Sequence, residues 1–130
     1  MTPPFTKISL TTVEDLAPPN GFGEHWEARV AREALGAQDT GVTLFRLRPG
    51  MRSPFTHRHR AAEEVYVVLR GSGRAKLDGE LVDVGPLDAI RVAPQTARAF
   101  EAGPDGLELI AFGPRHAGDG EPVEDPWTDA

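Results

Sequence analysis

The 130-residue sequence contains no cysteine, and this absence removes several kinds of chemistry. A disulfide scaffold, a thiolate metal site and a cysteine nucleophile are all excluded, and a reducing cytosol suits such a chain. No apolar run approaches the length that spans a membrane, and the first eight residues lack the charged and apolar regions of a signal peptide. The sequence therefore predicts a cytoplasmic protein without membrane contact.

Basic residues are missing from the C-terminal end of the chain. The whole sequence has 14 Lys and Arg against 20 Asp and Glu, a net charge of −6. The acidic residues after Arg115 are Asp119, Glu121, Glu124, Asp125 and Asp129. No basic patch stands out, so nucleic acid is not an expected partner. Trp127 predicts that this acidic tail docks on the body, because a wholly disordered tail rarely needs a tryptophan.

Long amphipathic helical stretches are also missing, whereas glycine and proline are frequent. The apolar runs between these residues are short and rich in β-branched side chains, which is typical of an all-β domain. Strands are expected at residues 42–48, 65–69, 74–77, 80–84, 87–92, 97–101 and 107–112. Residues 26–35 fit either a strand or a short helix. This spacing of short strands predicts a sandwich or a small barrel.

Glycine-containing segments between these runs are expected to reverse the chain. Asp78-Gly79 is a signal for a type I′ hairpin between its two flanking strands. We also expect turns at residues 71–73 and 103–106. Residues 65–69 are apolar on both faces, so this strand should be central in the sheet.

Two histidines, His57 and His59, are the first candidate metal ligands. Residues two apart on a strand point to the same side, so the two imidazoles should face one space. Glu64 follows at the start of the next expected strand. Two neutral imidazoles and one carboxylate suit a divalent Zn, Fe, Ni or Mn ion.

This segment resembles the first motif of the cupin family. In that family a glycine is followed by two histidines one residue apart, then a glutamate, six residues and a second glycine. Gly50, His57, His59, Glu64 and Gly71 match the motif, with six residues instead of the usual five after the first glycine. The resemblance implies a double-stranded β-helix, or jelly-roll barrel, that forms a homodimer and binds a small molecule.

The family resemblance also suggests how the chain is organised. We expect a single cupin domain over residues 1–130. Its barrel core should span about 40–114, between an N-terminal arm at 1–39 and the acidic tail at 115–130.

The second cupin motif departs from the family pattern at its metal ligand. An alignment on Pro94 and Phe100 places Arg98 where the family has a histidine. A guanidinium has no usable lone pair and stays protonated, so Arg98 cannot be a ligand. An inward Arg98 would repel a cation, pair with Glu63 or Glu64, or hold an anionic group of a substrate.

Two functions remain open. The first is a small-molecule-binding cupin with an incomplete two-histidine, one-glutamate metal site, for which the family implies dioxygenase, isomerase or lyase chemistry. The second is a metal-free binding or accessory module in which Arg98 replaces the metal. A sensor domain is disfavoured, because the chain has no room for a helix-turn-helix and no basic face. The candidate substrate-binding residues are Arg98, Tyr66 and Phe100.

Overall fold

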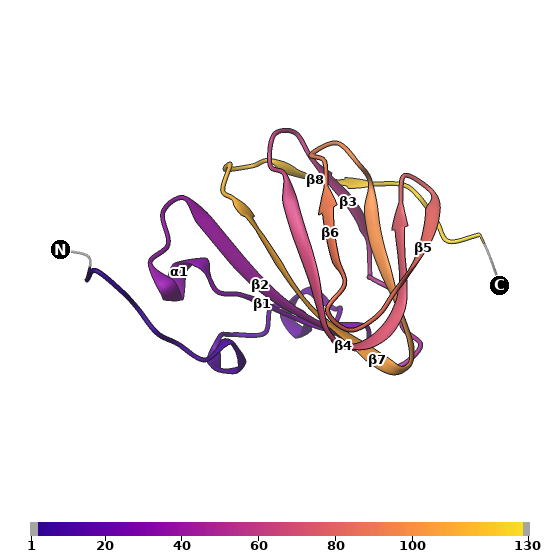
Figure 1. Cartoon of the computed structure of the whole chain (residues 1–130), viewed down its shortest axis with the longest axis horizontal. Coiled ribbons are helices and arrows are strands. Elements are labelled where there is room, and N and C mark those ends of the chain that lie inside the picture. The colour runs from indigo at the N-terminus through magenta and orange to yellow at the C-terminus, as the bar shows by residue number, and fades with distance from the viewer. Residues whose placement is uncertain (1–2, 129–130) are drawn as a thin grey trace.

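A computed structural model describes residues 3–128, which form a curled antiparallel sheet of eight strands (Figure 1). The strands are β1 (Trp26–Val30), β2 (Thr40–Leu47), β3 (Thr56–His59), β4 (Glu64–Leu77), β5 (Glu80–Val84), β6 (Ala89–Val92), β7 (Arg98–Pro114) and β8 (Gly120–Val123). The helical segments are α1 (Arg32–Leu35) and two 3-10 turns, Leu10–Thr12 and Pro18–Asn20. The all-β prediction is confirmed. Residues 1–2 of the predicted N-terminal arm and Asp129 of the predicted acidic tail lie outside the described residues.

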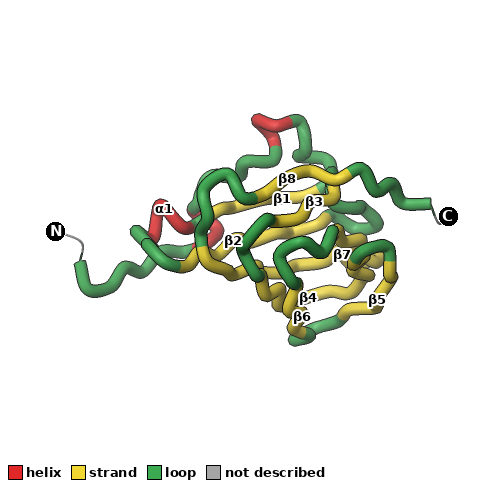
Figure 2. The backbone as a smooth tube through the Cα atoms, turned by 90° about the horizontal axis from the view of Figure 1, so that it is seen from above, coloured by secondary structure: helices red, strands yellow, loops and turns green. Residues whose placement is uncertain are grey.

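Two long strands, β4 and β7, hold the sheet together. β7 pairs with β2, β3 and β4, and β4 pairs in addition with β5 and β6. β4 contains residues 65–69, so the prediction that this segment is central is confirmed. The strands run side by side across the molecule, and the helical segments lie outside them (Figure 2). No helix within residues 3–128 is long and apolar enough to cross a membrane.

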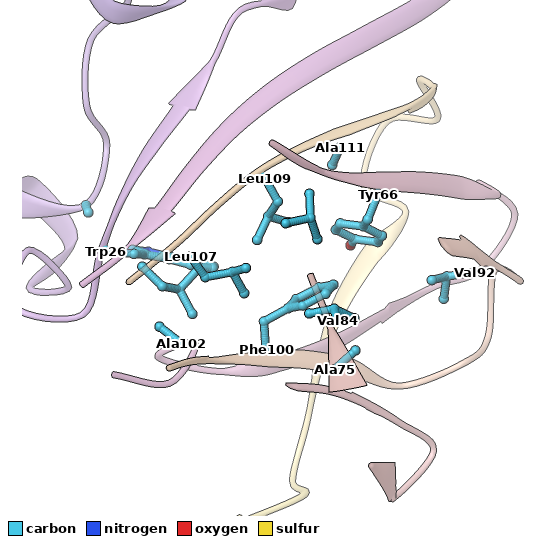
Figure 3. Close-up of a cluster of buried hydrophobic side chains, with 13 residues drawn as sticks. Trp26, Tyr66, Ala75, Val84, Val92, Phe100, Ala102, Leu107, Leu109 and Ala111 are labelled. Atoms are coloured by element: carbon cyan, nitrogen blue, oxygen red, sulfur yellow. The ribbon is translucent and has the colours of Figure 1, made fainter. Parts of the chain in front are cut away.

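The hydrophobic core lies between the curled halves of the sheet. Alternate residues of β4 and β7 enter it, as the two-residue period of a strand requires. Tyr66 and Phe100 pack with their ring centroids 4.9 Å apart, beside Leu107 and Leu109 (Figure 3). Each large side chain buried in this way contributes roughly 1.5–3 kcal/mol of hydrophobic stabilisation. Tyr66 and Phe100 are also residues of the candidate site.

Two local predictions can be compared directly with the structure. Asp78 and Gly79 have positive φ angles of 50° and 85°, as a type I′ turn requires, and connect β4 to β5. The hairpin prediction is confirmed. Residues 26–35, which fitted either a strand or a helix, form both in succession, as β1 and then α1.

The turns predicted at residues 71–73 and 103–106 are wrong. Both segments lie inside strands, the first in β4 and the second in β7. A Cβ on Gly73 would collide with the carbonyl oxygen of Glu101 on the neighbouring strand. The glycines therefore allow β4 and β7 to approach closely at two register shifts, and the chain bends without reversing. As a consequence, the two strands expected on either side of residues 103–106 are one strand.

The acidic tail contributes an edge strand that was not expected. β8 pairs with β3, and the chain then continues to Trp127, whose ring lies 4.6 Å from the guanidinium carbon of Arg52. Lys76 Nζ donates to the carbonyl oxygen of Pro126 at 2.8 Å. The predicted docking of the tail is confirmed. β1 likewise adds a strand from within the predicted N-terminal arm.

Candidate metal centre

The short strand β3 presents two histidines to one space. The rings of His57 and His59 lie 5.2 Å apart and nearly perpendicular to each other. Glu64, the first residue of β4, reaches the same space, and one ligand atom from each of the three residues lies within 4.8 Å of the others. The three side chains, called the metal trio below, lie close enough to hold a metal ion.

Glu64 is held in place by neighbours that favour its carboxylate form. Its Oε1 accepts a hydrogen bond from the Tyr66 hydroxyl at 2.8 Å and lies 3.8 Å from Nε2 of His57. Burial alone would raise the pKa of Glu64, but the contacts with His57, Tyr66 and His59 outweigh burial and lower the pKa below its ordinary value. Glu64 is therefore an anion at neutral pH, as a metal ligand must be.

Tyr66 remains a hydrogen-bond donor to this carboxylate. Burial and the negative charge of Glu64 hold the pKa of Tyr66 well above its ordinary value of 10.0, against an opposing effect of Arg98. The phenol consequently keeps its proton at physiological pH. Tyr66 is almost wholly buried and fixes the position of Glu64 from inside the barrel.

His59 is oriented by Asp119, a residue that the sequence analysis assigned only to the acidic tail. Asp119 Oδ2 lies 3.2 Å from Nδ1 of His59, and its carboxylate also accepts the backbone N–H groups of Ala61 and Ala62 at 2.8 and 2.9 Å. Burial alone would raise the pKa of Asp119, but these N–H groups and His59 outweigh burial and lower the pKa below its ordinary value. Asp119 therefore stays ionised at neutral pH. A carboxylate only accepts, so the contact with Asp119 favours a proton on Nδ1, and in the neutral ring Nε2 then offers its lone pair.

The bare nitrogen of His59 is the feature that fits a metal. Nε2 is buried and makes no hydrogen bond within the described part of the chain, although Oε1 of Glu64 lies 3.2 Å away. A buried nitrogen without a partner is costly and calls for an explanation. The donor set of two imidazole nitrogens and one carboxylate suits a divalent Zn, Fe, Ni or Mn ion. The residues present therefore fit the metal that the sequence predicts.

Arg98 lies at the start of β7, directly opposite His57 in the β3–β7 register. It is 0% exposed, and its guanidinium donates to the carbonyl oxygens of Ala93 at 3.1 Å and Pro94 at 3.5 Å. Its Nε has no partner, and no acidic side chain among residues 3–128 pairs with it. The alternative in which Arg98 neutralises Glu64 through an ion pair is therefore not the arrangement seen here.

The metal trio lies between two spaces of different size. The inner space leaves room for about one water molecule. The predicted substrate-binding residues Arg98, Tyr66 and Phe100 line this inner space together with His57. The outer space is a cavity of about 250 Å³ whose wall includes His59 and Glu64. Contact of Arg98, Tyr66 and Phe100 with a substrate remains a prediction.

Comparison with known proteins identifies the family. The sequence model described as a cupin domain matches residues 43–112, which is 70 of the 130 residues. The chain belongs to the cupin family. The resemblance found in the sequence is thereby confirmed. No curated protein matches this cupin.

Solved structures show the same fold. A cupin protein from Bacteroides fragilis is 21% identical, covers 98% of this chain and 93% of its own length, and gives a TM-score of 0.71. A polyketide cyclase from Streptomyces resistomycificus is 22% identical with coverages of 93% and 87% and a TM-score of 0.75. A sugar phosphate isomerase from Silicibacter pomeroyi is 19% identical with coverages of 92% and 83% and a TM-score of 0.74. The predicted jelly-roll barrel is confirmed.

Proposed function

We propose that this cupin binds a divalent metal ion through the metal trio and a small organic molecule beside it. The observation that carries the proposal is the buried Nε2 of His59, which lies 3.2 Å from Oε1 of Glu64 and has no hydrogen-bond partner within residues 3–128. When bound, a divalent Zn, Fe, Ni or Mn ion would polarise a ligand oxygen or, as iron, support oxygen chemistry. With three protein ligands, coordination positions stay open for a small molecule.

The surrounding residues have supporting roles in this proposal. Tyr66 holds Glu64 by its hydroxyl, and Asp119 holds the ring of His59 in the tautomer that a metal requires. Arg98 and Phe100 complete the inner wall and are proposed, with Tyr66, to contact the bound molecule. Dioxygenase, isomerase and lyase chemistry are all compatible with this site, because one fold supports many activities. The similar structures include a named cyclase and a named isomerase, which is compatible with small-molecule chemistry.

A metal-free binding or accessory module is the second candidate, and one observation favours it. Arg98 brings a fully buried positive charge to the strand opposite His57, and this charge lacks an acidic partner within residues 3–128. A cation nearby would weaken the binding of another cation. In that case the barrel would bind its ligand through Arg98 and without a metal.

Metal binding by the purified protein separates the two functions. The protein is stripped with a chelator and titrated calorimetrically with Zn²⁺, Ni²⁺, Mn²⁺ and, without oxygen, Fe²⁺. We expect one ion per chain, and an affinity at least about 100-fold weaker in His57→Ala/His59→Ala. His25→Ala is the control, because His25 lies outside the metal trio, and it should bind like the wild type. If the wild type takes up none of these ions, the metal-free module is the better description.

The homodimer, the cytoplasmic location and the single domain over residues 1–130 belong to the same proposal. The family resemblance supports the dimer, and the absence of cysteine suits a reducing compartment. Light scattering on the purified protein measures its mass directly, and a mass of one chain would remove the dimer from the proposal.

A further inference from the structure

The larger cavity beside the metal trio has basic residues in its wall. Its volume is about 250 Å³, and Glu64 and His59 form part of its surface. The apolar residues in the wall are Val30, Val42, Ala62, Ala111 and Pro114. Arg32 and Arg115 line it as well. Both arginines also line an adjoining outer cavity of about 520 Å³, so they lie where a molecule would pass from one cavity to the other.

Arg32 has a buried donor without a hydrogen-bond partner among the described residues. The methylenes of its side chain pack over Gly41, where an added Cβ would lie 3.4 Å from Cδ of the arginine. Its Nη2 donates to the carbonyl oxygen of Gln38 at 3.3 Å, whereas its buried Nε has no partner in the described structure. A desolvated N–H of a charged group is expected to have an acceptor, and no atom of residues 3–128 supplies one.

The charges of the cavity favour an anion as its ligand. Arg32 and Arg115 contribute two positive charges, and Glu64 and Asp119 contribute two negative charges, so the lining is neutral without a metal. Asp119 is engaged with backbone N–H groups, and Glu64 belongs to the metal trio. A divalent ion in the trio would leave the cavity with an excess of two positive charges. A bound oxyanion would balance this excess and match the planar donors of arginine.

We propose that this cavity binds a small molecule that carries a carboxylate or phosphate group, held by Arg32 and Arg115, with the rest of the molecule directed toward the metal trio. The assignment deepens the proposed function and rests on it, because the trio supplies both the reacting centre and the excess positive charge. It also places the anion-binding arginines in the wall of the cavity of about 250 Å³, separate from Arg98 in the inner space.

Ligand titrations with matched probes test the assignment. Metal-loaded and metal-free protein are titrated with succinate, with inorganic phosphate and with neutral succinamide, which has the size of succinate without its charge. The metal-loaded wild type should bind succinate or phosphate at least about tenfold more tightly than succinamide. The stronger of the two anions identifies a carboxylate or a phosphate ligand. Arg32→Gln and Arg115→Gln should each lose about tenfold in anion affinity and little in succinamide affinity.

The control is Arg48→Gln, which removes the same charge at a site outside this cavity and should bind the anions like the wild type. Circular dichroism verifies the fold, and Arg115→Gln changes an exposed side chain in case Arg32→Gln does not fold. Equal affinity for succinate, phosphate and succinamide, or a preference for anions that survives both arginine substitutions, would overturn the assignment.

Metal binding and anion preference are measured separately, so failure of the proposed function can be told from failure of the arginine site. If no metal binds, the proposed function fails, and the metal-free titrations still decide the role of the arginines. An anion preference that Arg32→Gln abolishes then supports the arginine site alone, and no preference overturns it. Normal metal binding without any anion preference overturns only the arginine site.

Discussion

Arg98 and Lys76 are buried cations on adjacent strands, yet their surroundings differ. Lys76 is 7% exposed and Arg98 is 0% exposed, and they lie on neighbouring rungs of the β4–β7 ladder. Lys76 Nζ lies 3.1 Å from Oδ1 of Asp125 and donates to the carbonyl oxygen of Pro126. Arg98 has two carbonyl oxygens as acceptors and no acidic partner among the described residues. One cation is compensated, and the other is not.

The same contrast extends to the two regions around these cations. The cluster around Lys76, called the tail clamp below, consists of Arg52, Arg74, Lys76, Glu101, Asp125 and Trp127. Glu101 pairs with Arg52 at 2.6 Å and with Arg74 at 2.7 Å, and the ring of Trp127 lies against the cations. In the metal centre, Nε2 of His59 and Nε of Arg98 have no hydrogen-bond partners among the described residues. Paired charges in the tail clamp hold the fold together, whereas unpaired groups in the metal centre are available to a ligand.

The C-terminal segment serves both regions, and Asp119 is its contribution to the metal centre. In Asp119→Asn an amide would face Nδ1 of His59 and Ala62 N–H, and its nitrogen donates where the carboxylate accepted. The proton of His59 should move to Nε2, and metal affinity should fall by about 10- to 100-fold. Nitrogen-15 NMR of the metal-free protein reports the tautomer, and calorimetry reports the affinity.

Glu121→Gln provides the control for Asp119→Asn. Glu121 is an acidic residue of the same segment, and it pairs with Arg58 rather than with a histidine of the trio. This variant should keep the wild-type tautomer and metal affinity. If Asp119→Asn also keeps the wild-type tautomer and metal affinity, the C-terminal segment does not position the metal centre. The segment would then contribute to the tail clamp alone.

The sequence predicted those features that depend on neighbouring residues. Asp78-Gly79 specifies its hairpin because both residues tolerate positive φ, and His57 and His59 share a side because they are two apart on a strand. Glu64 follows from the spacing of the cupin motif, and Trp127 indicated a docked tail. These features are local or belong to a known motif, so the fold and the metal trio were accessible before the structure.

Features that depend on contacts between distant segments were not predicted. Gly73 was expected in a turn because glycine often occurs in turns, whereas it is required here by the carbonyl of Glu101 on another strand. Asp119 lies 60 residues from His59, and nothing in the sequence distinguishes it from the other acids of the tail. The unused Nε of Arg32 was also hidden, because burial and missing partners exist only in the folded chain.

Arg98→His would change the uncompensated cation into the histidine that the family pattern has. The substitution removes a buried charge and adds an imidazole on the strand opposite His57. Metal affinity should rise by roughly tenfold or more, because a repelling group is replaced by a donor. Titration of both proteins with Zn²⁺ measures the change. Unaltered affinity would show that Arg98 does not limit metal binding.

The smallest expected effect is a change in the free energy of unfolding when Lys76 or Arg98 is replaced by methionine. Lys76→Met removes the partner of Asp125 and leaves the carbonyl oxygen of Pro126 without its donor, so it should cost about 1–2 kcal/mol. Arg98→Met removes a buried charge that has no acidic partner, and relief from desolvation should offset the two lost hydrogen bonds, leaving stability unchanged or slightly higher.

Urea unfolding of the three metal-free proteins at pH 7 provides these free energies, and the two substitutions are matched because each replaces a long cation with methionine. The sign of the difference is the decisive quantity. A loss of stability in Arg98→Met as large as in Lys76→Met would mean that the two carbonyl oxygens compensate the guanidinium as fully as Asp125 compensates Lys76. Arg98 would then be a structural residue, and its unpaired Nε would no longer separate the metal centre from the tail clamp.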